Sequence, residues 1–322
     1  MTSEVRNASP TAPLYAELPY PADGVARTTN ARILRAGIEQ HAPDLLGQER
    51  LRIVDVGCGT GENTVSLRRF FPNAEVFGAD INRASLDLAE KLAARVGSPA
   101  RFVQCDLTRD LADALQVAFG GPFDVVVSMG VLHHLSEPKV GFSAVRQIIR
   151  PNGLFFCYLY SRHGRREDIA TKNLLNEILP ADASFGSRSR AISALRLANR
   201  HTLWGGLKAL RRRLRFGPPL LPWEMVQVAL HRNRVVHESD SFSNPCEHLY
   251  SLAEIRALLA ETGWDYIALA KNSGLPISPE EHSRSPAELE LLRRMDQNAM
   301  YDYFAFYYQF PGFSFFCRPK GG

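Results

Sequence analysis

The chain is poor in cysteine and contains no long apolar run. Its five cysteines among 322 residues are odd in number, widely spaced and without a CxxC pair, which argues against a disulfide framework and a metal site. No apolar run approaches the ~20 residues of a membrane span. Because the first residues also lack the apolar core of a secretory signal, we expect a soluble, cytoplasmic protein with no membrane span.

Acidic residues are absent from one long segment, Ser187 to Gly217, which holds nine lysines and arginines. The positive net charge of the chain, +4, is therefore local to this segment. Leucines from Leu203 to Leu214 recur there at helical spacing, with the cations on other faces. A solvated helix face explains this pattern, and so does contact with RNA or another acidic partner.

Short apolar strands alternate with amphipathic helices from Arg52 to Tyr160. Parallel strands need a helix to return the chain, so this rhythm predicts a doubly wound parallel sheet. After a long interruption we expect a helix at 251–262, a strand at 264–270 and a last, antiparallel strand at 314–318 that closes the edge. The predicted fold class is α/β, with a seven-stranded, mostly parallel sheet.

The same rhythm divides the chain into four parts. Residues 1–30 are expected to form an N-terminal arm, and 31–161 a ligand-binding core. Residues 162–245 interrupt the sheet where a helical lid over the substrate would stand. The remainder, 246–322, is expected to complete the sheet and to carry an aromatic-rich helical insertion at 272–311.

A glycine-rich turn follows the first predicted strand, with the sequence Asp55-Val56-Gly57-Cys58-Gly59-Thr60-Gly61. Glycines let the backbone pass close to a ligand and aim a helix N-terminus at it, which is typical of nucleotide sites. The dinucleotide fingerprint G-x-G-x-x-G is the obvious rival, but here the third glycine comes one position early. Asp55 would also repel a pyrophosphate, whereas it suits a cationic amino-acid group.

Two further aspartates stand at successive strand ends. Asp80 ends the second strand, where a carboxylate can accept hydrogen bonds from both hydroxyls of a ribose. Asp106 follows the third strand and can accept a hydrogen bond from an adenine amino group, between the apolar side chains of Ile81 and Leu107. Each aspartate alone is more often a helix cap, but together they indicate a nucleoside.

These motifs, with Val131-Leu132-His133-His134-Leu135, resemble the ordered motifs of class I S-adenosylmethionine-dependent methyltransferases over roughly 52–160. The resemblance implies a Rossmann-like methyltransferase fold with S-adenosyl-L-methionine as cofactor and S-adenosyl-L-homocysteine as product. It also implies that Gly57 and Gly59 face the amino-acid part of the donor, Asp80 its ribose, and Asp106 with Leu107 its adenine. Asp55, Cys58, Gly61 and Ile81 are further candidate cofactor-binding residues. By the same pattern, Ser128 and Met129 line the sulfonium side.

Methyl transfer needs an aligned nucleophile and, for a hydroxyl, a base. His133 and His134 follow the fourth strand, so either is a candidate catalytic base or a packing residue. The Asn/Asp-Pro-Pro-Tyr sequence used for nucleobase and glutamine amides is absent, which weighs against those acceptors.

Several residues outside the core are candidates for the rest of the site. Tyr303 and Tyr307, in a dense aromatic run, suit a planar acceptor or the core. Glu247 and His248 precede the helix at 251–262 and are candidate substrate ligands or turn residues. In the arm, Tyr20 is expected to fold over the donor, together with Tyr15 and Arg27.

We therefore expect an enzyme that methylates a small, aromatic or hydrophobic O- or N-nucleophile, of the secondary-metabolite type. One alternative is an RNA or protein methyltransferase that docks through 187–217, and another is a non-catalytic donor-binding module. The oligomeric state is open, with a homodimer as one possibility.

Overall fold

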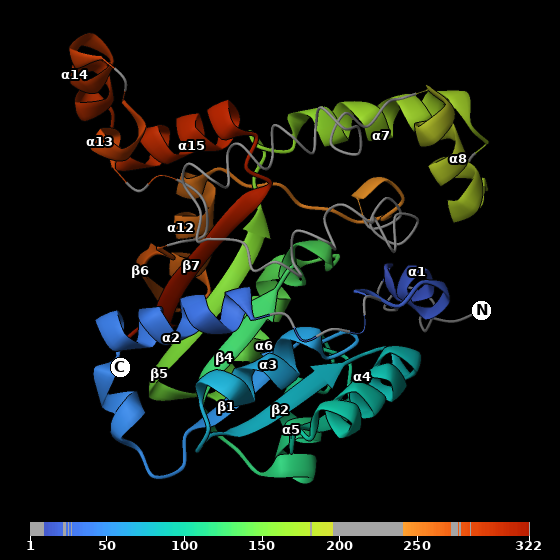
Figure 1. Ribbon diagram of the computed structural model, residues 1–322, viewed down its shortest axis with the longest axis vertical. Coiled ribbons are helices and arrows are strands. Elements are labelled where there is room, and N and C mark those ends of the chain that lie inside the picture. The colour runs from blue at the N-terminus through green and yellow to red at the C-terminus, as the bar shows by residue number, and fades with distance from the viewer. Residues whose placement is uncertain are drawn as a thin grey trace.

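The computed structural model describes residues 10–21, 24, 26, 28–180, 182–195, 241–271, 276, 278–283 and 285–321. Its centre is a seven-stranded sheet with the order β3-β2-β1-β4-β5-β7-β6 (Figure 1). The strands are β1 (Arg52–Val56), β2 (Glu75–Asp80), β3 (Arg101–Gln104), β4 (Phe123–Met129), β5 (Ile149–Tyr160), β6 (Trp264–Leu269) and β7 (Gly312–Pro319). Strands β1 to β5 are parallel, and β7 is antiparallel to both of its neighbours. The predicted fold class is confirmed.

The place of the last strand differs from the prediction. Strand β7 was expected to close the edge of the sheet, but it lies between β5 and β6, and β6 is the edge strand. The reason is burial, because six consecutive residues of β7 are buried whereas the middle of β6 is only half-buried. A strand buried on both faces belongs in the interior of a sheet.

Helices cover both faces of the sheet. Helices α2 (Thr29–His41), α3 (Glu62–Phe70) and α4 (Arg83–Val96) lie on one face, and α5 (Leu111–Phe119), α6 (Pro138–Ile148) and α12 (Leu252–Glu261) on the other. Successive residues of β1 show the alternation, since Ile53 packs with Leu34 of α2 while Val54 belongs to the core of Phe142 in α6.

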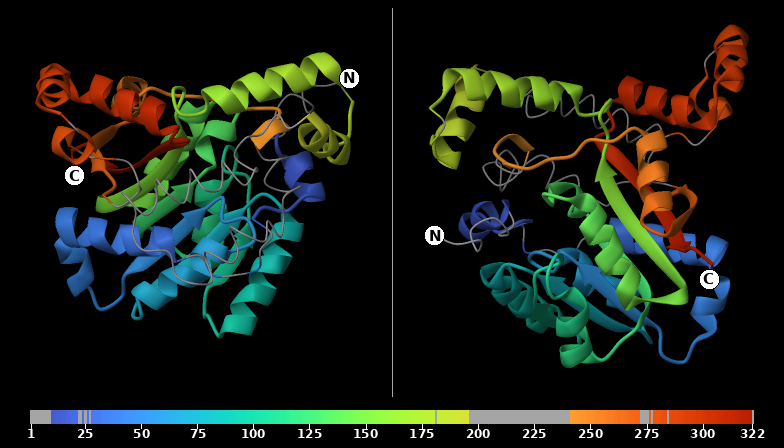
Figure 2. Two further views of the ribbon diagram at one scale, coloured as in Figure 1. Left: turned by 45° about the horizontal axis from the view of Figure 1, so that its top comes forward. Right: turned by 180° about the vertical axis from the view of Figure 1, so that it is seen from behind.

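The remaining helices lie beyond the carboxyl ends of the parallel strands. In Figure 1 the arrow of β5 points toward α7 (Arg166–Ile178), which leads to α8 (Phe185–Leu195). Helices α13 (Pro279–His282), α14 (Pro286–Arg294) and α15 (Gln297–Tyr308) stand at the same end, and both views in Figure 2 agree. The short α1 (Ala12–Glu17) contacts α4. The basic helix expected at 203–214 lies outside the described residues.

Two 3-10 turns complete the described chain, η2 (Pro43–Gly47) and η3 (Leu132–His134). Turn η3 connects β4 to α6. No helix in the described part of the chain is long and apolar enough to cross a bilayer.

Candidate active site

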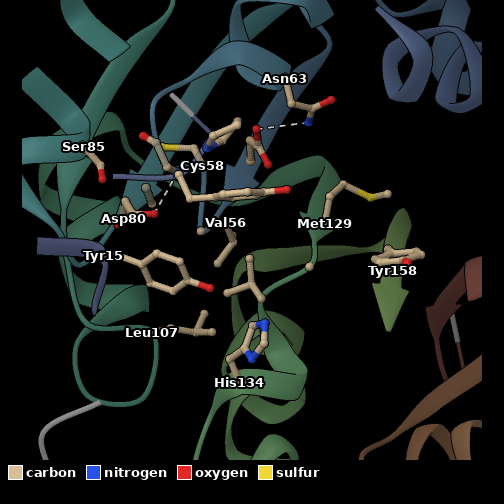
Figure 3. A pocket seen from close by; sticks show the side chains of 18 of the residues that line it. Tyr15, Val56, Cys58, Asn63, Asp80, Ser85, Leu107, Met129, His134 and Tyr158 are labelled. Carbon is tan, nitrogen blue, oxygen red and sulfur yellow. Dashed lines mark hydrogen bonds between the residues drawn. The ribbon is translucent and has the colours of Figure 1, made fainter. Parts of the chain in front are cut away.

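A cavity of about 450 Å³ opens at the carboxyl ends of β1, β2, β4 and β5. Strands β1 and β4 are neighbours where the strand order reverses, and in open α/β sheets ligands bind at this switch point. In Figure 3, Asp80, Tyr15 and Leu107 lie on one side of the cavity and Met129 and Tyr158 on the other.

In the glycine turn after β1, the backbone lies very close to the backbone of the N-terminal arm. Gly57, Gly59 and Gly61 have φ angles of 75°, 52° and 76°, which favour glycine. A Cβ on Gly59 would lie 2.2 Å from the carbonyl oxygen of Tyr20, so the arm crosses directly over the turn. The turn leads into α3, and Asn63 in the first turn of this helix lines the cavity.

Asp80 joins the end of β2 to this turn. One carboxylate oxygen accepts a hydrogen bond from the amide of Gly59 at 2.8 Å, and the other accepts one from the amide of Asn82 at 2.9 Å. Burial raises the pKa of Asp80, and these amide groups oppose the rise because they favour the carboxylate. Asp80 and Ile81 both line the cavity.

Asp55 is buried at the end of β1 and also lines the cavity. Its carboxylate accepts hydrogen bonds from Thr64 Oγ1 at 2.7 Å and from Asn63 Nδ2 at 3.1 Å, the latter drawn in Figure 3. Burial raises the pKa of Asp55 to about 6, and the two hydrogen bonds oppose that rise. Asp55 therefore changes charge close to neutral pH. Cys58 of the same turn lines the cavity, and burial raises the pKa of its thiol.

The third strand end contributes Asp106 and Leu107, which both line the cavity. One oxygen of Asp106 accepts hydrogen bonds from the amide and the hydroxyl of Thr108, at 2.8 and 2.7 Å. At the end of β4, Met129 lines the cavity, whereas Ser128 is fully buried and is not among the described lining residues.

The two candidate histidines occupy different environments. His134 lines the cavity, and its Nδ1 lies 2.8 Å from the carbonyl oxygen of Cys246. His133 is fully buried and outside the described lining, with its ring 3.8 Å from that of Tyr160. Burial, and then the positive charge that His134 and Arg165 can carry, holds the pKa of His133 well below its ordinary value. His133 is therefore neutral at physiological pH.

The structure does not bring the four candidate substrate ligands into the described lining of the cavity. Glu247 forms buried ion pairs with Arg165 and Lys172, at 3.0 and 3.5 Å. His248 lies next to Cys246, with Nε2 3.8 Å from Sγ. This segment packs behind the wall of the cavity, so its charged groups meet protein partners.

Tyr303 and Tyr307 are one turn apart on α15, and that face of the helix packs on His282, with ring centroids 5.4 and 4.8 Å away. Of the aromatic residues between Tyr301 and Phe316, Phe310 is the one among the described lining residues of the cavity.

Two tyrosines of β5 line the cavity and were not predicted from the sequence. Tyr158 and Tyr160 alternate at the end of a strand that neighbours β4. The strand-end position that pointed to Asp80 would have found them. In the arm, Tyr15 and Tyr20 line the cavity, and the hydroxyl of Tyr15 accepts a hydrogen bond from Asn244 at 3.0 Å. Arg27 lies outside the described residues.

Known proteins match the core that carries these motifs. A sequence model described as "Methyltransferase domain" matches residues 54–155. An uncharacterized protein of Synechococcus sp. is 36% identical over 118 residues, which cover 37% of this chain and 27% of that protein. The ubiquinone biosynthesis O-methyltransferase of Cereibacter sphaeroides is 34% identical over 115 residues, or 36% of this chain and 43% of that enzyme. The chain thus matches less than half the length of these curated relatives.

The fold is similar to that of PKMT2 from Rickettsia typhi. The TM-score is 0.62 at 14% identity, over 94% of this chain and 55% of that one. A second structure of PKMT2, in complex with AdoHcy, matches with a TM-score of 0.57 at 15% identity, over 85% of this chain and 49% of that one. At this identity the likeness concerns the fold. Residues 54–155 of this chain therefore carry a methyltransferase domain.

Proposed function

We propose that the protein transfers a methyl group from S-adenosylmethionine to an O- or N-nucleophile of a small, neutral, aromatic or hydrophobic molecule. The observation that carries this proposal is the division of the cavity into two unlike halves. One half holds the glycine turn and the three strand-end aspartates, Asp55, Asp80 and Asp106, which suit the amino group, the ribose and the adenine of the donor.

The other half is apolar and aromatic. It is formed by Met129, Tyr158, Tyr160, Phe310 and Pro311, next to Leu135 and His134. Apart from the three aspartates and His134, the described lining residues carry no titratable acid or base other than cysteine and tyrosine. Aromatic walls enclose a planar ligand with little loss of side-chain freedom, and a charged acceptor would find no counter-ion among these residues.

The family supports the same acceptor class. The matched relative from Cereibacter sphaeroides is named for O-methylation in ubiquinone biosynthesis, and its match covers 36% of this chain. A natural product of comparable polarity fits the apolar half. An RNA or protein acceptor docking through 187–217 is the alternative, and most of that segment lies outside the described residues.

The acceptor class is tested with paired compounds. We expect phenols and aromatic amines to be methylated, and each carboxylate-bearing analogue to react at least tenfold more slowly in kcat/KM, since its charge would lose hydration without gaining a partner. Activity that depends on added RNA or protein would support the alternative. Donor binding without transfer to any acceptor would indicate a non-catalytic donor-binding module.

We propose that His134, and not His133, is the catalytic base. The same substitution at each histidine distinguishes their roles. His134→Gln should lower kcat about 100-fold or more, which is the usual order for a lost base, and should leave donor affinity unchanged. His133→Gln should lower thermal stability, because His133 is fully buried, while kcat per folded molecule stays within a few-fold. Stopped assays and donor titrations of both variants measure this. Equal losses of kcat would contradict the assignment.

Asp55 should make donor binding depend on pH. Its carboxyl has a pKa of about 6, and the cationic amino group of the donor favours the ionised form. Affinity should therefore fall as pH drops below about 6, by up to tenfold per unit. Titrations between pH 5 and 8 measure this, and Asp55→Asn should bind more weakly with no such slope. The same slope in that variant would exclude Asp55 as its cause.

The stability of the free protein should show the opposite trend. Since the folded state holds this proton more tightly than the unfolded chain, whose aspartate pKa is about 3.9, the contribution of Asp55 is full below pH ~4 and is lost as pH rises through about 6. Chemical denaturation of the wild type and of Asp55→Asn across this range isolates that contribution.

A further inference from the structure

We propose that Glu247 and Arg165 form a positioning pair for His134, which holds the Cys246 carbonyl against its imidazole and so selects the tautomer able to accept a proton from the substrate. This inference rests on the proposed role of His134 as the base. It gives Glu247 a task different from the substrate contact that the sequence predicted.

The first step concerns the imidazole itself. The carbonyl oxygen of Cys246 lies 2.8 Å from Nδ1 of His134, and a carbonyl can only accept a hydrogen bond. Nδ1 must therefore carry the hydrogen, and in the neutral ring the basic lone pair is on Nε2. The ring belongs to the cavity wall in Figure 3, and Nε2 itself is buried, so a substrate proton reaches this atom only from a molecule seated inside the cavity.

The second step concerns the segment that supplies this carbonyl, Asn244–His248. It runs along the histidine turn η3 and is joined to it at three places. Besides the contact with His134, the amide of His248 donates to the carbonyl of His133 at 2.8 Å, and Cys246 Sγ donates to the carbonyl of Leu135 at 3.4 Å. The carbonyl that selects the tautomer is thus placed by the position of this one segment.

The third step concerns what holds the segment from behind. The Glu247 carboxylate, 2% exposed, lies 3.0 Å from Nε of Arg165, whose side chain is 3% exposed. Arg165 also lies 3.8 Å from the carboxylate of Asp168. Lys172 reaches Glu247 at 3.5 Å and donates to the carbonyl of Asn244 at 2.7 Å. Two cations, Arg165 and Lys172, therefore meet two acids, Asp168 and Glu247, behind this segment.

The same arginine reaches the cavity wall. The Arg165 guanidinium lies 3.8 Å from the centre of the Tyr160 ring, and the rings of His133 and His134 lie 3.8 and 5.4 Å from that ring. Because Tyr160 lines the acceptor half, one buried cation contacts both the wall of the cavity and the carboxylate beside Cys246.

The free-energy cost of burying these charged side chains indicates what the ion pair does. Taking charges out of water is expensive, and well-packed apolar side chains of similar size often stabilise a protein as much or more. A buried ion pair is thus weak evidence for stability, whereas the attraction of Arg165 and Lys172 for Glu247, at 3.0 and 3.5 Å, keeps the carboxylate and its segment in one place. Here that geometry places the carbonyl of the residue next to Glu247 on Nδ1 of the proposed base.

The test is Glu247→Gln, with Glu261→Gln as the matched control, since Glu261 pairs with Lys139 on the exposed surface. Nitrogen-15 spectra of labelled histidine report the tautomer without any acceptor. We expect the wild type and Glu261→Gln to show His134 as the Nδ1–H tautomer, and Glu247→Gln to show a mixture. In Glu247→Gln, kcat should fall at least tenfold while the Kd of S-adenosylmethionine stays within twofold.

A second variant separates positioning from packing. Glu247→Leu combined with Arg165→Met removes both members of the pair if Glu247→Gln fails to fold, and Asp168→Asn in the same variant removes the buried acid that would otherwise lose its arginine. It should fold and still show mixed His134 tautomers with lowered kcat. A single, unchanged His134 tautomer in the folded variants would overturn the proposal. If the Glu247 variants show mixed His134 tautomers but His134→Gln keeps its activity, the positioning of His134 by Glu247 and Arg165 would be supported. The proposed role of His134 as the catalytic base would then be refuted.

Discussion

Asp80→Ala should weaken the binding of S-adenosylmethionine at least tenfold, or by about 1.4 kcal/mol. The variant loses the carboxylate proposed to accept both ribose hydroxyls, and such charge-assisted hydrogen bonds are the stronger kind. It also leaves the amides of Gly59 and Asn82 without their present acceptor, so the glycine turn loses its tie to β2. Calorimetric titration of the purified variant measures the loss.

A matched control is available on the next helix. Asp87 is about half exposed and pairs with Arg83 on the surface of α4, so Asp87→Ala should bind the donor as the wild type does. Unchanged affinity in Asp80→Ala would remove the ribose assignment. A tenfold loss in both variants would show that the effect is one of overall charge.

Gly59→Ala should reduce donor affinity by about two orders of magnitude or more. Its Cβ would stand 2.2 Å from the carbonyl oxygen of Tyr20, so the arm or the turn must move, and both border the donor half of the cavity. The positive φ of 52° adds a strain of roughly 1 to 2 kcal/mol for a residue with a side chain.

Gly97→Ala distinguishes the steric clash of the new Cβ from the backbone strain of a positive φ. Gly97 also has a positive φ, of 66°, but no atom lies within 4 Å of the position of its Cβ. This control should lose roughly 1 to 2 kcal/mol of stability and keep its donor affinity. Thermal melts of both variants measure the loss of stability, and donor titrations measure the loss of donor affinity. Equal donor affinities in the two variants would show that the close crossing of arm and turn does not shape the site.

The core of the fold could be predicted from the sequence because its signals are local. Apolar runs and helical periodicity between Arg52 and Tyr160 agree with the alternating strands and helices of the structure from β1 to β5. The position of β7 could not be read in this way, because it depends on which distant strands it pairs with.

The lining residues of the proposed donor half could be predicted equally well, since the glycine turn, Asp80 and Asp106 each follow a strand whose end is visible in the sequence, and all line the cavity. The lining residues of the proposed acceptor half could not be predicted in this way. His133 and His134 are neighbours with the same chemistry, and only the 3-10 turn η3 places one in the cavity wall and the other in the core. The partner of Glu247, Arg165, lies at the start of α7 and far away in the sequence. In the sequence alone, a charged residue whose ion-pair partner is remote is easily taken for a substrate ligand.

The central claim, methyl transfer to a small molecule, is tested most directly with labelled methyl groups. The protein is incubated with S-adenosylmethionine labelled in the methyl group and an extract of its source cells, and the products are separated by size after nuclease or protease treatment. The account predicts label in small molecules that resist both treatments, and at least a tenfold loss in Asp80→Ala at a donor concentration below its Kd. Label that disappears with nuclease or protease, or that is unchanged in Asp80→Ala, would contradict it.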